Sequence, residues 1–256
     1  MSDDGLVDPG SIWTRVEEVA STGSTNADVR ARAVGGADEG LVLSADEQTA
    51  GRGRLGRRWT APPGSGLAVS VLLRPSARPA AQGGGMPLLV GLAAVDAVDA
   101  VVEGTRLPVG LKWPNDVMIG ECKVGGVLVE RVETGLGPAA VAGLGLNVSM
   151  EEPQLPVPTA TSLLAEGATV DRRALLRAYL ASLDSRYRAW RAGGSPREEY
   201  RQRCSTLGRD IRVLLPGDAP DVVGVAADVD ESGRLIVVVA NGSRVALSSG
   251  EVQHVR

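Results

Sequence analysis

The fold of this 256-residue chain is decided by residues 111–129, which read LKWPNDVMIGECKVGGVLV. This stretch contains three short apolar runs, and a fourth follows soon after it, at 111–113, 117–119, 127–129 and 139–146. Glycines and the Asn115-Asp116 pair separate the runs, which is typical of tight turns. Because parallel strands need crossovers of a dozen or more residues, strands so close together are expected to form antiparallel hairpins.

Helices and strands are predicted on both sides of this stretch. Residues 24–28 supply N-cap side chains for a short helix, which Gly35-Gly36 ends. Buried strands are expected at 41–43 and 67–73, and helices at 86–102, 172–190 and 196–204. Residues 1–12 show no apolar periodicity and are expected to form a disordered tail.

The last fifty residues differ in character from the rest of the chain. Short β-type runs are expected there at 212–215, 222–229, 235–239 and 245–247. Asn241-Gly242 lies between two of them and is a strong hairpin signal. The sequence therefore predicts an α+β fold: a mixed sheet with flanking helices at 13–206, and a small separate β-barrel at 207–256.

Composition narrows the function classes. The chain has no apolar run as long as a membrane span needs, and it begins with an acidic Met-Ser-Asp-Asp rather than a basic signal sequence. Cys122 and Cys204 are far apart in sequence, and the single histidine, His254, lies two residues from the C-terminus. This pattern excludes a structural zinc cluster and disfavours catalysis by Ser-His-Asp or Cys-His. We expect a cytoplasmic protein whose net charge of −4 argues against whole-surface binding of nucleic acid.

Lysine is rare in this chain. Only two of the 27 basic residues are lysines, Lys112 and Lys123, and both lie in the stretch quoted above. A lysine ammonium is a compact point charge, whereas a guanidinium is a broad planar fork, so a crowded phosphate site can require lysine. A turn at Asn115-Asp116 would bring both lysines to one site. Chance retention at two surface positions is the alternative.

The most densely charged segment is residues 51–59, GRGRLGRRW. Four guanidinium groups on a glycine-rich backbone suit an anion with several phosphate oxygens, and their mutual repulsion predicts a loop that becomes ordered when ligand binds. The glycines match a dinucleotide-binding pattern, but residues 61–63, Ala-Pro-Pro, cannot open the helix that such a fold requires. A solvated basic turn remains the alternative.

Two further segments place glycine where a ligand or a neighbouring backbone must approach closely. Gly125-Gly126 follows Lys123, and Gly143-x-Gly145-x-Asn147 ends an apolar strand with an amide.

Together these motifs resemble those of biotin protein ligases. They occur in the family's order: Ser24-Thr25-Asn26, Gln48 ahead of Ala50-Gly51-Arg52-Gly53-Arg54, Lys112-Trp113-Pro114-Asn115-Asp116, Lys123-x-x-Gly126, Gly143-x-Gly145-x-Asn147 and Ala160-Thr161-Ser162-Leu163. Leu55 stands where the family often has another arginine. The resemblance implies a central mixed sheet related to class II aminoacyl-tRNA synthetases and lipoyl ligases, with an SH3-like C-terminal barrel. It also implies the short form of the enzyme, because the residues before Ser24 are too few for the helix-turn-helix domain of some members.

The resemblance further implies a ligase that uses ATP and Mg²⁺ to form biotinyl-5′-AMP and then transfers biotin to a lysine of a biotin carboxyl carrier protein domain. It implies Lys123 and Arg54 as catalytic residues and Asp116 as a Mg²⁺ ligand. The residues implied to contact biotin are Ser24, Thr25, Asn26, Gln48, Gly51, Arg52, Arg54, Lys123, Gly125 and Gly126. Those implied to contact the nucleotide are Arg54, Arg57, Trp59, Lys112, Asn115, Lys123 and Asn147.

Two other activities are weighed against this hypothesis. A lipoate or octanoate ligase would use the same adenylation chemistry, but the Lys112–Asp116 segment and the arginine-rich loop favour biotin. A biotin-sensing repressor is disfavoured by the short N-terminal segment, so neither DNA nor a membrane is an expected partner. The oligomeric state is not readable from the pattern, and a homodimer is consistent with it.

Overall fold

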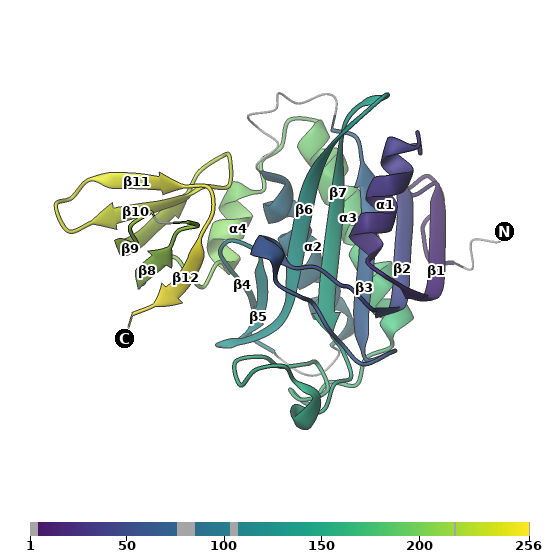
Figure 1. Cartoon of the computed structure of the whole chain (residues 1–256), viewed down its shortest axis with the longest axis horizontal. Coiled ribbons are helices and arrows are strands. Elements are labelled where there is room, and N and C mark those ends of the chain that lie inside the picture. Colours follow the sequence, from purple (N-terminus) through teal and green to yellow (C-terminus); the bar gives the residue numbers. More distant parts are fainter. Residues whose placement is uncertain (1–4, 76–84, 103–106, 218, 256) are drawn as a thin grey trace.

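The main body of the chain is a seven-stranded mixed β-sheet (Figure 1). The computed structural model describes residues 5–75, 85–102, 107–217 and 219–255. The strand order is β1-β2-β3-β7-β6-β5-β4, in which β1 and β2 are parallel and the other neighbours are antiparallel. The strands are β1 (Arg15–Thr22), β2 (Leu41–Gln48), β3 (Gly66–Leu73), β4 (Val109–Lys112), β5 (Asp116–Ile119), β6 (Cys122–Thr134) and β7 (Gly137–Asn147). The predicted hairpins from residue 111 onward are confirmed.

Helices cover both faces of this sheet (Figure 1). They are α1 (Thr25–Val34), α2 (Met86–Val101), α3 (Arg172–Arg191) and α4 (Arg197–Arg203). Leu41 and Leu43 of β2 join the apolar cluster under α1, whereas Val42 joins the larger cluster under α2 and α3. This separation follows from the alternation of side chains along a strand. Ser24 caps α1 as predicted, since its side chain accepts a hydrogen bond from the backbone of Ala27.

The C-terminal residues form a second, five-stranded antiparallel sheet with the order β11-β10-β9-β8-β12. Its strands are β8 (Asp210–Leu214), β9 (Val222–Val229), β10 (Leu235–Val239), β11 (Arg244–Leu247) and β12 (Glu251–His254). The predicted hairpin joins β10 to β11, and Gly242 has the positive φ of 81° that such a turn requires.

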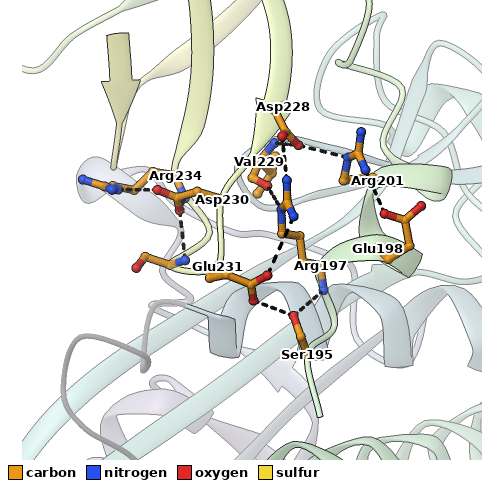
Figure 2. A network of polar contacts seen from close by, with 10 residues as sticks. Ser195, Arg197, Glu198, Arg201, Asp228, Val229, Asp230, Glu231 and Arg234 are labelled. Carbon is orange, nitrogen blue, oxygen red and sulfur yellow. Dashed lines mark hydrogen bonds and ion pairs between the residues drawn. The ribbon is translucent and has the colours of Figure 1, made fainter. Parts of the chain in front are cut away.

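An ion-pair network joins α4 to this second sheet (Figure 2). Arg197 Nη2 lies 2.6 Å from Asp228 Oδ2, and Arg201 Nε lies 2.9 Å from Asp228 Oδ1. Arg197 Nε also donates a 2.6 Å hydrogen bond to the carbonyl of Val229. Figure 2 shows Arg197 and Arg201 of α4 directed at the carboxylate of Asp228 in β9. The network therefore fixes the small sheet to the main body.

Three segments differ from the sequence-based predictions. Strands β1 and β12 were not predicted, because β1 is a largely exposed edge strand with polar residues on both faces and β12 has only four residues. Residues 5–12 pack on α3 rather than forming a free tail: Leu6 is 4% exposed, and the backbone N–H of Ile12 donates to Asp184 Oδ1 at 3.0 Å. Residues 1–4 lie outside the described residues.

Within the described part of the chain, no helix is long and apolar enough to cross a membrane.

Candidate active site

One cleft collects most of the predicted site residues. It lies where the N-terminus of α1, the end of β2, the loop at 52–59 and the turn at 113–116 face strands β6 and β7. The predicted residues that line it are Ser24, Thr25, Asn26, Gln48, Arg52, Arg54, Arg57, Trp59, Lys112, Asn115, Asp116, Lys123 and Gly126. Segments far apart in the sequence thus form a single site.

One end of the cleft is lined by neutral polar groups. The backbone N and Oγ1 of Thr25 lie 2.9 and 3.1 Å from Gln48 Oε1. Ser70 Oγ lies 2.7 Å from Thr25 Oγ1 and 2.6 Å from Asn26 Oδ1. The Asn26 amide donates to Glu130 Oε2 at 2.8 Å, which holds its side chain in place. Preset hydroxyls and amides suit a neutral polar ring better than a charged group.

Glycines of β7 and of the loop make room for these side chains. A Cβ atom at Gly143 would lie 2.1 Å from Asn26 Oδ1, and one at Gly145 would lie 2.6 Å from Trp59 Cε2. Gly51 is equally constrained, because its Cβ would lie 2.5 Å from the carbonyl oxygen of Trp59. These glycines were predicted to leave space for a ligand. In the structure they leave space for the side chains and backbone that form the cleft wall.

The arginine loop, residues 52–58, covers the cleft. It is closed at its base by a backbone pairing and is bound at its side by the C-terminal sheet. A β-bridge pairs Arg52 with Arg58 at its base. Arg57 forms an ion pair with Glu251 of β12, so the C-terminal sheet touches the loop directly. At the tip, Leu55 is 59% exposed and has a φ of 55°, a conformation that favours glycine.

Arg54 is the arginine of this loop that points toward the turn at 113–116. Its Nη1 donates to Asn115 Oδ1 at 3.4 Å. Burial lowers the pKa of the Arg54 guanidinium, while the nearby carboxylate of Asp116 acts in the opposite direction. A partly desolvated guanidinium at a cleft wall is well placed to pair with an anionic ligand.

Lys123 lies at the start of β6 and faces the same turn. Its Nζ is 2.5 Å from Asp116 Oδ1, and the two side chains are 37% and 23% exposed. Lys112 ends β4, directly opposite Asp116 in the β4–β5 register, and also lines the cleft. The two lysines of the chain therefore converge on one cleft, as their positions in the sequence predicted.

Three predicted site residues lie outside this lining: Gly51, Gly125 and Asn147. A Cβ at Gly125 would lie 2.4 Å from Leu146 Cδ2, so this glycine permits close packing of β6 on β7. Asn147 is 4% exposed, and its Nδ2 donates to the carbonyl of Thr161 at 2.8 Å.

The site also depends on residues that sequence reasoning missed, of which Ser70 is fully buried behind the cleft wall and Glu251 and Trp113 line the cleft. Ser70 is the single hydroxyl-bearing residue of β3, GLAVSVLL, and a polar residue inside an apolar strand was an available signal. Glu251 comes from the C-terminal sheet, and no local pattern marks it. The sequence analysis named Trp113 only within the Lys112–Asp116 motif and gave it no role of its own. It is 2% exposed, and its indole N–H donates to the carbonyl of Gly233 at 2.9 Å, so it anchors the turn on the C-terminal sheet.

Comparisons with known proteins decide the family. Residues 20–147 match the model of the biotin/lipoate A/B protein ligase family, and residues 206–255 match the model of the biotin protein ligase C terminal domain. The chain belongs to the biotin protein ligase family. The α+β fold and the small C-terminal β domain expected for that family are confirmed.

Relatives of this ligase are similar along nearly the whole chain. It is 43% identical to the biotin--[acetyl-CoA-carboxylase] ligase of Mycobacterium tuberculosis, over 99% of this chain and 94% of that protein. It is 34% identical to the ligase of the same name from Paracoccus denitrificans, over 89% of this chain and 95% of that protein. Among solved structures, the biotin protein ligase from Aquifex aeolicus in complex with biotin and ATP is 26% identical, with a TM-score of 0.79, and 95% of this chain and 100% of that one are covered.

Proposed function

We propose that this chain joins biotin to ATP as biotinyl-5′-AMP and then transfers biotin to a lysine of a biotin carboxyl carrier protein domain, in the cytoplasm. The observation that carries the proposal is the cleft itself, in which a neutral polar end at Thr25 and Gln48 adjoins a cationic end at Arg54 and Lys123. The names of the relatives and the ligands of the Aquifex aeolicus complex support this assignment of substrates.

In the first step, a carboxylate oxygen of biotin attacks the α-phosphorus of ATP and pyrophosphate leaves. Two anions must therefore be brought together while charge builds on the phosphate oxygens. Lys123 would lie between the carboxylate and the α-phosphate, with Arg52 and Arg54 closing from the arginine loop. Preorganised cationic groups of this kind stabilise such a transition state without a covalent enzyme intermediate.

The remaining cleft residues are assigned by their chemistry. Ser24, Thr25 and Gln48 would contact the ureido ring of biotin, which has two donors and one acceptor. The indole of Trp59 would offer a face to adenine, and Arg57, Lys112 and Asn115 would contact other parts of the nucleotide.

The described residues fit a Mg²⁺ ion that arrives with the nucleotide. They contain no group of three or more His, Cys, Asp or Glu that could hold a metal. Asp116 offers one carboxylate, and Mg²⁺ is commonly held by one or two carboxylates together with substrate phosphates. Bound at Asp116, the ion would neutralise phosphate charge.

In the second step, the deprotonated amine of the acceptor lysine attacks the acyl carbon of biotinyl-5′-AMP, and AMP leaves. Arg54 and the arginine loop would shield the mixed anhydride from water until the acceptor arrives. A role in DNA binding is not part of this proposal.

The experiment that tests the function is ATP–pyrophosphate exchange with biotin, lipoate or octanoate as the acid. We expect exchange with biotin, followed by labelling of a biotin carboxyl carrier domain. The C-terminal match to biotin protein ligases favours biotin over lipoate. Exchange that depends on lipoate or octanoate and not on biotin would overturn the proposal.

A further inference from the structure

A segment distant in sequence continues the sheet where β7 stops. β7 ends at Asn147, and its pairing with β6 begins at Gly125, so Lys123 lies beyond that pairing. The segment 159–161 takes the position next to Lys123. The backbone N–H of Lys123 donates to the carbonyl of Thr159 at 2.8 Å, and the N–H of Thr161 donates to the carbonyl of Lys123 at 2.8 Å.

Asn147 fastens this segment in place. Its Nδ2 donates to the carbonyl of Thr161 at 2.8 Å, and both residues are 4% exposed. The carbonyl of Asn147 in turn accepts a 3.1 Å hydrogen bond from the backbone N–H of Leu163. Both backbone polar groups of Thr161 are thus satisfied, one by Asn147 and one by Lys123. A buried carbonyl is costly to leave without a donor, so the amide of Asn147 constrains where Thr161 can lie.

Fixing the position of Thr161 in turn affects the ammonium group of Lys123, which faces the cleft. On its other side, Lys123 pairs with Met118 of β5, and its Nζ lies 2.5 Å from Asp116. Because a lysine side chain is long and flexible, the position of its ammonium depends on a fixed backbone and a fixed partner. The hydrogen bonds run without a break from the Asn147 side chain through Thr161 to the backbone of Lys123.

Resting on the function proposed above, we propose that Asn147 is a positioning residue for Lys123 and acts through Thr161. This role differs from contact with the nucleotide. A residue that only contacts ATP affects nothing before ATP binds. A residue that positions Lys123 affects the free protein and its binding of biotin without nucleotide.

The scarcity of lysine makes this role measurable without activity. Lys112 and Lys123 are the two lysines of the chain, so acylation of each amine can be followed by mass spectrometry with Lys112 as the internal reference. In Asn147→Ala and in the isosteric Asn147→Asp, we expect the Lys123/Lys112 labelling ratio of the free protein to change several-fold from the wild-type value. Biotin affinity without nucleotide should fall about tenfold or more, the scale of loss when a partner that orients a ligand-binding group is removed.

Thr161→Val is the matched control. It removes the hydroxyl that donates to Glu166 Oε1 at 2.7 Å but keeps both backbone groups of Thr161, so the labelling ratio should not change. If Asn147→Ala is too unstable to purify, Asn147→Asp is measured in its place.

Wild-type labelling and wild-type biotin affinity in a folded Asn147 variant that has lost only nucleotide affinity would overturn the inference. A wild-type protein that binds no biotin would instead contradict the proposed function, and the labelling ratio would still test the link from Asn147 to Lys123.

Discussion

Lys123 Nζ lies 2.5 Å from Asp116 Oδ1, and this pair forms the wall of the cleft beneath the arginine loop. The carboxylate of Asp116 holds the ammonium of Lys123, and an anionic ligand would compete with Asp116 for the same positive charge. The ion pair therefore keeps the positive charge of Lys123 at the place where two anionic substrates must meet.

Replacement of Lys123 by alanine should abolish most adenylate formation. Removal of one preorganised group at such a site lowers the rate by about 10²–10³-fold, or about 2.7–4 kcal/mol. Biotin-dependent ATP–pyrophosphate exchange measures this step. Arg131→Ala is the control, since the side chain of Arg131 is 59% exposed and forms an ion pair with the exposed Glu133. Near wild-type exchange in Lys123→Ala would contradict the assigned role.

Replacement of Arg54 by alanine should have a different effect. Arg54 comes from the loop over the cleft, and its Nη1 lies 3.4 Å from Asn115 Oδ1. Its loss should weaken the contact between the loop and the turn at 113–116 while leaving Lys123 in place. We expect the adenylate to form and then to leave for solvent quickly. Rapid filtration of the enzyme with labelled biotin gives the half-life of the bound adenylate, and an unchanged half-life would count against this account.

Substitutions at Gly143 and Gly145 of β7 should affect the binding of the two substrates separately. Gly143→Ala drives a methyl group into Asn26 and should weaken biotin binding, whereas Gly145→Ala drives one into Trp59 and should weaken nucleotide binding first. Gly135→Ala is the control, because a Cβ there meets nothing within 4 Å. Calorimetry with each substrate decides: equal losses of both affinities in both variants would argue against two separate subsites.

The junction between the domains should matter for stability. Arg197→Ala leaves the carboxylate of Asp228 with one arginine fewer and the carbonyl of Val229 without its 2.6 Å donor. We expect the free energy of unfolding to fall by about 1–3 kcal/mol, against a change within about 0.5 kcal/mol for Arg131→Ala. Urea denaturation of both variants tests this, and equal midpoints would show that the network in Figure 2 contributes nothing.

Stability should also fall on mild acidification because of His254. Burial is the main cause that lowers the pKa of this histidine below its usual value of 6.5, with Lys112 and Arg209 adding to it and Glu121 opposing. The unfolded chain therefore takes up a proton first as the pH falls. This contribution to stability is fully present above about pH 6.5 and is lost as the pH falls through the folded-state pKa. The urea midpoint should drop between about pH 7 and pH 5.5 in the wild type and less in His254→Gln. Identical profiles would refute the assignment.

Much of the site was predictable because its residues lie in short local motifs. Lys112 ends β4 and Lys123 lies at the start of β6, and both pair with the short strand β5 between them, so two consecutive local hairpins bring them together. Apolar runs such as 67–73 and 139–146 were equally clear, because a strand covered on both faces has few polar residues.

The remaining features depend on contacts between distant segments. No local pattern indicates that Gly143 makes room for Asn26, that Glu251 reaches Arg57, or that Asn147 turns from the cleft toward Thr161. Strand β1 was missed for a related reason: its place in the sheet comes from parallel pairing with β2, not from its own weak apolar pattern.

The most direct test of the account is a crystal structure of this protein with biotin and a non-hydrolysable ATP analogue. The account predicts Lys123 Nζ within hydrogen-bonding distance of both the biotin carboxylate and the α-phosphate, with the ureido ring against Thr25 and Gln48. A complex in which Lys123 remains on Asp116 alone, or points into solvent away from both ligands, would contradict it.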